Sequence, residues 1–316
     1  MTSKHDELPR IAILLPTYNG EEYLSEQIDS LLSQSHDNFI IVTRDDGSTD
    51  DTRAIIARYA SKFPNHFHVV ASDGKNLGAC ASFSLLMEYV LDAQESLGLT
   101  SAYMMFCDQD DVWHENKISK SVSSLLTLEK RYPNRACLVH CDLKVVNDER
   151  GLLAKSFFSY QGIRPAKRSF ARFLVSNSVT GCTAIINEKL AALATPIPPQ
   201  AIMHDWWVAL LAAAFGHIET LDEALIDYRQ HEKNTVGAKP YQSSKWSLHK
   251  VKAAFNDPVY DDINRALVRQ ASSFAGLFHS RIKNQHTFVL MAALWMGSKR
   301  RIVRNAVLKV FLSMST

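Results

Sequence analysis

The stretch Met104-Met105-Phe106-Cys107-Asp108-Gln109-Asp110-Asp111-Val112-Trp113 decides how this sequence folds. It begins as an apolar run of strand length and ends in a cluster of carboxylates. An unpaired charge in a protein core is strongly unfavourable, so we expect these carboxylates at the mouth of a buried strand. In an extended chain, Asp108 and Asp110 project to the same side and can reach one divalent cation. The other interpretation is an acidic turn that begins the following helix, with Asp111 in its first turn.

Apolar runs alternate with segments of helical periodicity along the chain. Strands are predicted at residues 11–15, 39–42, 67–71, 103–107, 136–141, 180–186 and 223–228. Helices are predicted at residues 21–35, 55–63, 79–91, 116–131, 187–194 and 204–216, whereas residues 147–180 show no clear pattern. This alternation predicts an α/β fold with a doubly wound, mostly parallel sheet flanked by helices. Ligands of such sheets bind beyond the carboxyl ends of the strands, which favours the metal interpretation of Asp108 and Asp110.

The composition is that of an ordinary globular protein. The chain has 316 residues, of which 46% are hydrophobic and 22% are charged. Its five cysteines form no CxxC pair and lie mostly in apolar runs, which argues against a disulfide framework or a zinc ribbon and indicates a reducing compartment. Residues 1–10 lack the apolar core of a signal peptide, and no apolar run approaches the roughly 20 residues that span a bilayer. A cytoplasmic location is therefore expected.

The net charge of +2 conceals a division of the chain into two parts. Residues 1–238 carry 22 Lys and Arg against 30 Asp and Glu, whereas residues 239–316 carry 13 against 3. Within the basic part, residues 286–312 combine positive charge with many apolar residues. Such a helix suits the headgroup layer of an anionic membrane, and it equally suits an appended helix packed on the body, so both interpretations stay open. No module typical of nucleic-acid binding is present in the sequence.

The loops after the first two predicted strands carry residues suited to a nucleotide. Neither GxGxxG nor GxxxxGK[ST] occurs, so a nucleotide would be held in another way. Asp46 could accept the imide hydrogen of uracil or thymine, and Tyr18 could place its ring on the face of the base. The alternative is a turn in which Asp45 and Asp46 bond local backbone groups.

Two later segments carry further chemistry. Met203-His204-Asp205-Trp206-Trp207 opens a predicted helix, and a carboxylate in such a half-apolar setting is suited to act as a general base. The alternative is that Asp205 only caps this helix. Arg229, His231 and Lys233 gather in the loop after the last predicted strand, and this set suits a diphosphate and its cation.

Five motifs, taken together and in this order, resemble those of the family 2 inverting glycosyltransferases of the GT-A fold, and most of all the bacterial rhamnosyltransferase-type members. They are Pro16-Thr17-Tyr18-Asn19-Gly20, Asp45-Asp46-Gly47-Ser48-Thr49-Asp50, Asp108-Gln109-Asp110-Asp111, His204-Asp205-Trp206-Trp207 and Tyr228-Arg229-Gln230-His231. The likeness covers residues 10 to about 238. It implies an enzyme that moves a sugar from a UDP- or dTDP-sugar to a hydroxyl of a glycan or lipid-linked acceptor in bacterial surface polysaccharide synthesis. Rhamnose is indicated by the family likeness alone.

The same resemblance implies a role for each residue. Asp205 would be the catalytic base, and Asp108, Asp110 and His231 would hold Mn²⁺ or Mg²⁺. The expected contacts of the diphosphate are Arg229 and Lys233, those of the nucleotide are Thr17, Tyr18, Asn19, Asp46, Asn76, Gly78 and Asp108, and the expected acceptor wall is Trp113, His204, Trp206 and Trp207. Residues 1–115 would bind the nucleotide-sugar, residues 116–238 would form the acceptor-binding and catalytic half of the same domain, and residues 239–316 would be a basic helical C-terminal extension.

Two other functions could use the same side chains. A metal-dependent nucleotide-sugar phosphohydrolase would direct the carboxylates at water, and a non-catalytic nucleotide-sugar-binding protein would bind without turnover. If the basic tail binds membrane, the protein would lie on the inner face of the cytoplasmic membrane. The motifs name neither the donor sugar nor the acceptor, because the shape of a pocket sets that choice.

Overall fold

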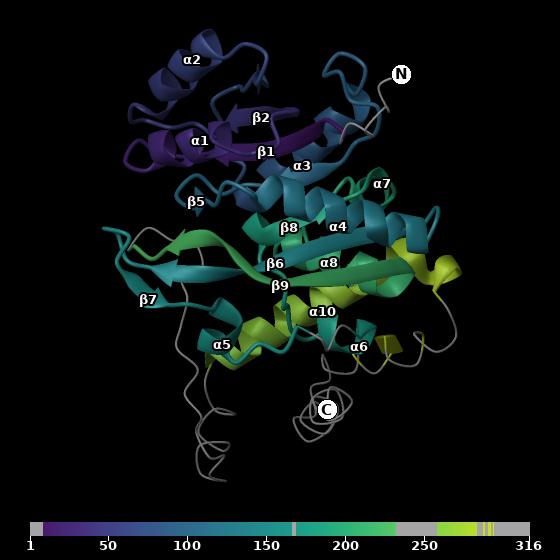
Figure 1. Ribbon diagram of the computed structural model, residues 1–316. Helices are drawn as coiled ribbons and strands as arrows, with labels where there is room; N and C mark the ends of the chain where they lie inside the picture. Colours follow the sequence, from purple (N-terminus) through teal and green to yellow (C-terminus); the bar gives the residue numbers. More distant parts are fainter. Residues whose placement is uncertain are drawn as a thin grey trace.

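A computed structural model describes residues 9–165, 169–231 and 258–282, together with residues 287, 290, 291 and 293. Its first part alternates strands and helices as expected (Figure 1). The elements in this part are β1 (Ile11–Thr17), α1 (Leu24–Leu32), β2 (Phe39–Asp45), α2 (Thr52–Lys62), β3 (Phe67–Val69), α3 (Ala79–Asp92) and β4 (Met104–Phe106). The elements that follow are β5 (Val112–Trp113), α4 (Lys117–Arg131), β6 (Ala136–Val146), β7 (Leu152–Ala154), α5 (Phe157–Gln161), α6 (Phe170–Phe173), the 3₁₀ helix η1 (Gly181–Thr183), β8 (Ala184–Ile186), α7 (Glu188–Ala194), α8 (His204–Phe215), β9 (Gly216–Arg229), α10 (Pro258–Phe278) and η2 (His279–Arg281).

The described strands form one sheet in the order β3-β2-β1-β4-β8-β6-β9-β5, with β7 paired to β6. Strands β3, β2, β1 and β4 run parallel to one another, β8 is antiparallel to both β4 and β6, and β9 is parallel to β6. The expected α/β sheet flanked by helices is confirmed, and its departures from parallel order begin at β8. Because β1, β2 and β4 are parallel, the loops that follow them lie at one end of the sheet.

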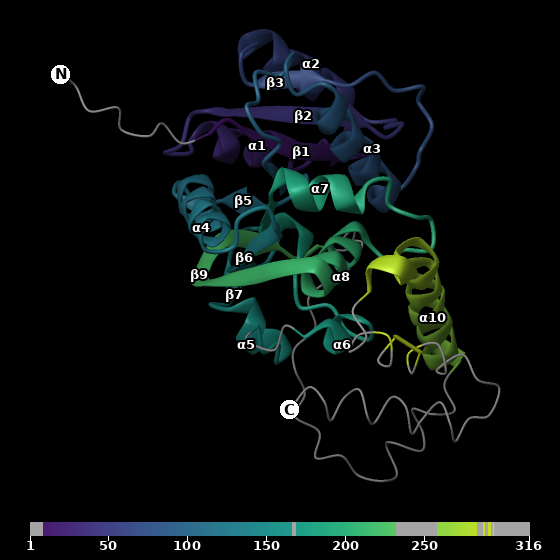
Figure 2. The same ribbon diagram turned by 90° about the vertical axis from the view of Figure 1, so that its right-hand side faces the viewer.

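Both faces of the sheet are covered, which explains the continuous apolar runs. Ala12 and Leu14 of β1 pack into a core with α3, α7 and α8, whereas Ile13 and Leu15 pack into a second core with α1 and α4. The two helical layers lie on opposite sides of the sheet in Figure 2. Since successive side chains of a strand point to opposite faces, both alternating sets of side chains in β1 are apolar over residues 11–15.

The helical C-terminal extension is described over α10, which packs on the body beside α8. Phe274 of α10 is fully buried, stacks on Phe215 and meets the edge of Trp207. Most of the basic segment 286–312, together with Lys233, lies outside the described residues. Within the described residues, no helix combines the length and apolar character needed to cross a membrane.

Several predicted boundaries are wrong in the second half of the sheet. The strand predicted at residues 136–141 continues to Val146 as β6, because the side chain of Asp142 accepts hydrogen bonds from the N–H groups of Leu143 and Phe158 and is thereby satisfied in the interior. Residues 181–183 form η1, so only 184–186 of the predicted strand are extended. Strand β9 begins at Gly216, directly after α8, and residues 147–180 contain β7, α5 and α6.

Candidate functional site

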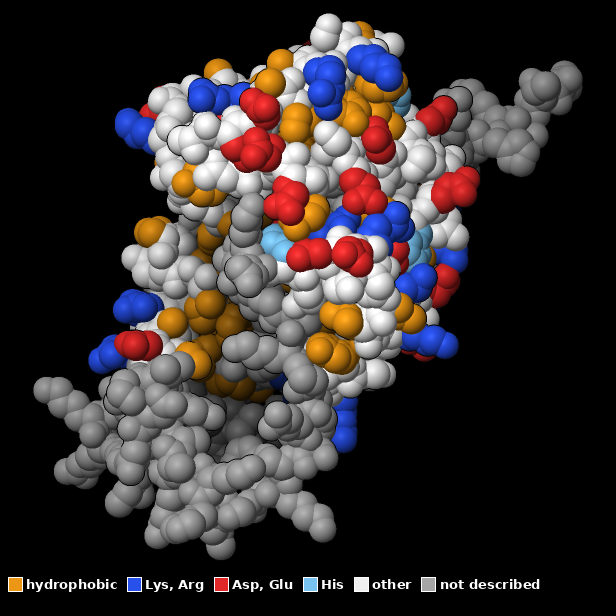
Figure 3. All heavy atoms as spheres, turned by 90° about the vertical axis from the view of Figure 1, so that its left-hand side faces the viewer, with side chains coloured by type: hydrophobic (Ala, Val, Ile, Leu, Met, Phe, Trp, Pro, Cys, Tyr) orange, Lys and Arg blue, Asp and Glu red, His pale blue; other side chains and the backbone are white. Residues whose placement is uncertain are grey.

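The loop after β1 is joined to the acidic turn after β4 by one side chain, that of Gln109. Its amide nitrogen donates to the Tyr18 carbonyl and its Oε1 accepts from the Tyr18 N–H, both at 2.9 Å. Gly20 permits this approach, because a Cβ there would lie 2.5 Å from Gln109 Oε1. Figure 3 looks onto this end of the sheet, where acidic side chains gather across the middle of the face. The two strand ends therefore form a single site.

Thr17 and Asn19 connect the first loop to the second. The buried Thr17 hydroxyl donates to Asp45 at 3.3 Å, and the N–H of Asn19 donates to Ser48 Oγ at 2.9 Å. Asn19 adopts a left-handed backbone with a φ of 46°, which asparagine tolerates better than most residues. Tyr18, between them, is 47% exposed, so its ring is available to a ligand.

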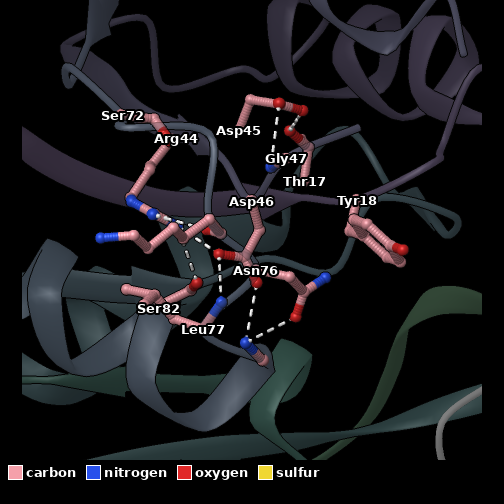
Figure 4. A network of polar contacts seen from close by, with 12 residues as sticks. Thr17, Tyr18, Arg44, Asp45, Asp46, Gly47, Ser72, Asn76, Leu77 and Ser82 are labelled. Atoms are coloured by element: carbon pink, nitrogen blue, oxygen red, sulfur yellow. Dashed lines mark hydrogen bonds and ion pairs between the residues drawn. The ribbon is translucent and has the colours of Figure 1, made fainter. Parts of the chain in front are cut away.

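Asp46 is the buried centre of a polar network at the end of β2 (Figure 4). Its carboxylate accepts from the Arg44 guanidinium and, at 2.8 Å each, from the N–H groups of Leu77 and Gly78. Burial opposes ionisation of this group, but these donors together lower the pKa of Asp46. Asp46 therefore holds the loop before α3 against the sheet. Its two backbone donors, Leu77 and Gly78, are remote in sequence, so these bonds are not those of a local turn.

Asp45 and Asn76 make the local turns at these loops. The Asp45 carboxylate accepts from the N–H groups of Gly47 and Ser48 at 3.2 and 3.0 Å. Asn76 is exposed, and its Oδ1 accepts from the N–H of Gly78 at 3.0 Å. The alternative interpretation of an Asx turn therefore applies to Asp45.

The carboxylates after β4 lie close to Asp205 and to the last loop. Burial, then the charge of Asp110 and then that of Asp205, raise the pKa of Asp108 to about 7. The Nε2 atom of His231 lies 2.9 Å from Asp110 Oδ2. Residues far apart in the sequence thus lie close together, and their concentrated negative charge suits a divalent cation.

Asp111 is fully buried, unlike the partly exposed Asp108 and Asp110. Its Oδ1 accepts from the N–H of Arg229 at 3.1 Å, and its ligand atoms lie within 4.8 Å of those of Asp108 and Cys182. The fully buried Lys117 ammonium lies 3.3 Å from the centre of the Trp113 ring, and burial lowers its pKa to about 8. A lysine and a carboxylate therefore share the interior beneath the acidic turn.

Asp205 lies in the first turn of α8, while Met203 occupies the N-cap position without a side-chain cap. The Oδ2 atom of Asp205 accepts a hydrogen bond from the N–H of Gly181 at 3.0 Å. Burial raises the pKa of Asp205 to about 7, although the Trp206 and Gly181 N–H groups act in the opposite direction. A carboxyl group with this pKa can take up and release a proton near neutral pH.

His204, next to Asp205, is buried and lies between two aromatic rings. Its ring centre is 3.9 Å from that of Phe83 and 5.1 Å from that of Phe106. Burial lowers its pKa to about 3, so this histidine is neutral. His204 also restricts position 181, where a Cβ would lie 2.6 Å from the His204 Nε2.

The four residues expected in the acceptor wall differ in exposure. Trp113 and Trp207 are 2% and 1% exposed and His204 is 4% exposed, so these three side chains lie mostly inside the protein. Trp113 faces the core from β5, and Trp207 donates its ring N–H to the Ala194 carbonyl between α8 and α7. Trp206 is partly exposed, and its ring N–H donates to the Phe173 carbonyl.

Three residues with a clear place in the site were not predicted. Gln109 could have been noticed from its position between two acidic residues. Lys117 resembles an ordinary helix-surface lysine in the sequence, and nothing there indicates its burial. Gly181 follows a threonine in an apolar segment, and only the fold brings its N–H to Asp205.

Comparison with known proteins identifies the family. The model described as glycosyl transferase family 2 matches residues 12–189. The dTDP-rhamnosyl transferase RfbG of Shigella flexneri is 27% identical over 231 residues, which cover 71% of this chain and 74% of RfbG. The putative teichuronic acid biosynthesis glycosyltransferase TuaG of Bacillus subtilis is 23% identical over 246 residues, which cover 77% of this chain and 88% of TuaG.

Solved structures agree on the fold. The crystal structure of S. aureus TarS residues 1–349 in complex with UDP-GlcNAc superposes with a TM-score of 0.52 and 16% identity, covering 90% of this chain and 79% of that chain. The same TarS fragment in complex with UDP gives a TM-score of 0.52 and covers 97% of this chain and 89% of that chain. At this level of identity the likeness carries the fold alone.

Proposed function

The chain belongs to glycosyl transferase family 2, and from this premise we propose that it moves a sugar from a nucleotide diphosphate to an acceptor hydroxyl with inversion at the anomeric carbon. The observation that carries the proposal is the meeting of Asp205 with the acidic turn, where the charge of Asp205 contributes to the raised pKa of Asp108. The two kinds of chemistry that a sugar transfer needs therefore share one site. One is accommodation of the diphosphate charge, and the other is removal of a proton from the acceptor.

In the proposed reaction, Asp205 takes the proton of the acceptor hydroxyl. The acceptor oxygen then forms a bond to the anomeric carbon as the bond to the diphosphate oxygen breaks on the opposite face, and the nucleoside diphosphate leaves. Asp205 is suited to this role because its pKa of about 7 lets it act as a base near neutral pH. The N–H of Gly181, which donates to Oδ2, orients the carboxylate.

Mn²⁺ or Mg²⁺ is the proposed cofactor. The Asp108 and Asp110 carboxylates and His231 would hold the cation, which when bound would offset the negative charge of the diphosphate. Asp108, with its pKa of about 7, fits a cation because burial and two neighbouring carboxylates leave its charge poorly compensated.

The nucleotide would lie against the loops after β1 and β2. Tyr18 presents an exposed ring for the base, and Asp46 Oδ2 accepts from the Gly78 N–H, which leaves lone-pair capacity for a base donor. Thr17 and Asn19 support the same loops, and Asn76 is exposed beside them. For Arg229 we propose a supporting role at the diphosphate, with its guanidinium already bound to the Asp110 carbonyl.

The names of the relatives support particular partners. RfbG is named a dTDP-rhamnosyl transferase, TuaG is named for teichuronic acid biosynthesis, and TarS was crystallised with UDP-GlcNAc. We therefore propose a UDP- or dTDP-sugar, with rhamnose among the candidates, as the donor. The proposed acceptor is a glycan or lipid-linked hydroxyl in bacterial surface polysaccharide synthesis, used on the inner face of the cytoplasmic membrane.

The test begins with the donor. Purified protein is heated with each of a panel of UDP-, dTDP- and GDP-sugars, in Mn²⁺ or in EDTA, and the sugar that raises the melting temperature only with Mn²⁺ identifies the donor. Transfer is then followed with a panel of glycan and lipid-linked acceptors, and the product's anomeric configuration is read by NMR. Nucleotide release at the same rate with and without acceptor would instead indicate a phosphohydrolase. Binding without any release would indicate a sensor.

A further inference from the structure

Tyr23, immediately before α1, lies against two residues that hold the acidic turn. The centre of its ring is 4.8 Å from that of His231 and 4.7 Å from the guanidinium carbon of Arg229. Its hydroxyl donates to Asp148 Oδ1 at 3.0 Å, which fixes the ring against the turn after β6. The first helix and the last loop of the site are therefore connected through one aromatic side chain.

Arg229 and His231 in turn hold Asp110 from two sides. The Nε atom of Arg229 donates to the Asp110 carbonyl at 3.0 Å, and the Arg229 N–H donates to Asp111 Oδ1 at 3.1 Å. His231 Nε2 lies 2.9 Å from Asp110 Oδ2. These contacts fix both the backbone and the carboxylate of the residue expected to bind the cation.

Glu26, one turn further along α1, anchors the far end of the Arg229 side chain. Its carboxylate accepts from Arg229 and also, at 3.1 Å, from Arg150. Arg150 continues the chain of contacts to Asp227 of β9 at 3.2 Å. Arg229 is 3% exposed, so an ion pair with Glu26 limits the freedom of a buried, charged side chain.

We propose that Tyr23 and Glu26 are positioning residues that set the geometry of the Asp110–His231 pair for a divalent cation. This inference rests on the proposed function, in which that pair holds Mn²⁺ or Mg²⁺. Neither residue contacts the proposed ligand atoms of Asp110, and each acts through Arg229 or His231. Residues that orient the ligands of a metal typically change its affinity about 10- to 100-fold when they are replaced. The first helix thereby contributes to cation binding without supplying a ligand.

The test measures Mn²⁺ binding directly, by electron paramagnetic resonance of free Mn²⁺ in the presence of UDP, alongside the Mn²⁺ concentration that gives half-maximal transfer. Tyr23→Leu removes the ring, Tyr23→Phe removes only the hydroxyl, and Glu26→Gln removes the charge that anchors Arg229. Glu95→Gln, an exposed position after α3, is the matched control for the charge.

We expect Tyr23→Leu and Glu26→Gln to weaken Mn²⁺ binding about 10- to 100-fold while transfer at saturating Mn²⁺ is largely kept. Tyr23→Phe should retain most of the affinity, and Glu95→Gln should bind as the natural protein does. A lower melting temperature with unchanged Mn²⁺ affinity in Tyr23→Leu and Glu26→Gln would show that the two residues serve stability alone, which overturns the inference. Because the resonance signal needs no turnover, weakened Mn²⁺ binding in a protein that transfers no sugar would refute the proposed function and leave this inference standing.

Discussion

Burial raises the pKa of Asp205 to about 7, and this value makes a definite prediction for the pH dependence of the reaction. A general base works only when it is deprotonated, so kcat/KM should rise about tenfold per pH unit below 7 and level off above it. Asp205→Asn should lower turnover by roughly 10²- to 10⁴-fold while donor and Mn²⁺ binding are kept. Steady-state rates at a series of pH values check both expectations. A variant that keeps its turnover would remove Asp205 from the role of base.

The raised pKa of Asp205 also predicts how the stability of the folded protein depends on pH. In the folded protein the pKa of Asp205 is about 7, above the ordinary value of 3.8. At a pH between these two values, the native state therefore keeps a proton that the unfolded chain has lost. The stability contributed by this group is therefore lost as the pH rises from 3.8 to about 7. Asn carries no charge and still offers an oxygen to the Gly181 N–H.

Asp205→Asn should consequently melt at a higher temperature than the natural protein at pH 8, and the gain should shrink at pH 5. Thermal unfolding at the two pH values measures this difference. The matched control is Asp92→Asn at the exposed end of α3, which should show no such pH-dependent gain. An equal gain at both pH values would contradict a buried, ionised carboxylate at position 205.

At the scale of single residues, the sequence indicated which side chains carry the chemistry, but not which side chains are buried. The position of strand ends favoured Asp108 and Asp110 as a cation-binding pair, whereas the resemblance to the family implied that Asp205 and His231 join them. The burial of Trp113 and of Lys117 could not be predicted, because it depends on which face of β5 and of α4 meets the core. A buried ammonium is unfavourable in isolation, and only the aromatic ring beneath it and the acidic turn above make this position acceptable.

At the scale of elements, the corner between α8 and β9 depends on one glycine. A Cβ at Gly216 would lie 1.8 Å from the carbonyl oxygen of Ala136, its partner in the sheet. This neighbour is backbone in a paired strand and cannot move aside, so Gly216→Ala should destabilise the protein by more than about 2 kcal/mol. Urea unfolding followed by circular dichroism measures the loss.

Gly276 of α10 provides the matched control, because no heavy atom lies within 4 Å of a Cβ built there. Gly276→Ala should stabilise the protein by about 0.5–1 kcal/mol through helix propensity alone. Similar effects of the two substitutions would mean that Gly216 is not held against β6 as the structure has it.

The elements from β1 to β4 were predictable because β1, β2 and β4 contain runs of apolar residues and the helices between them carry apolar stripes, whereas the two-residue strand β5 was not predicted. The strands after residue 115 were harder to predict, for a physical reason. Strand β9 carries Glu219, Asp222 and Glu223 within its length, and β6 contains the buried Asp142, so neither has the uninterrupted apolar pattern of β1. The register between β6 and β9 also shifts on both sides of Asp142, which further interrupts the alternation of side chains along these strands.

At the scale of the whole molecule, the two halves that the sequence suggested share their cores. The core on one face joins Ala12 and Leu14 of β1 to Leu138 of β6 and Leu211 of α8. The sheet continues from β3 to β5 without a break, because β8 pairs with both β4 and β6. The proposed site takes Asp46 from one half and Asp205 from the other, so its geometry depends on this continuity.

We therefore expect the two halves to unfold as one cooperative unit. Leu211→Ala, in a fully buried position of α8, should cost about 2–5 kcal/mol. Hydrogen exchange in low urea, read by mass spectrometry, should show the same loss of protection in β1 of the first half as in β6 and β9 of the second. Ile263→Ala, at a side chain of α10 that is 50% exposed, is the control and should change stability by less than about 0.5 kcal/mol. If β1 kept its full protection while β9 lost its own, the halves would be separate folding units, and an active site built across them would require an interface rather than a common core.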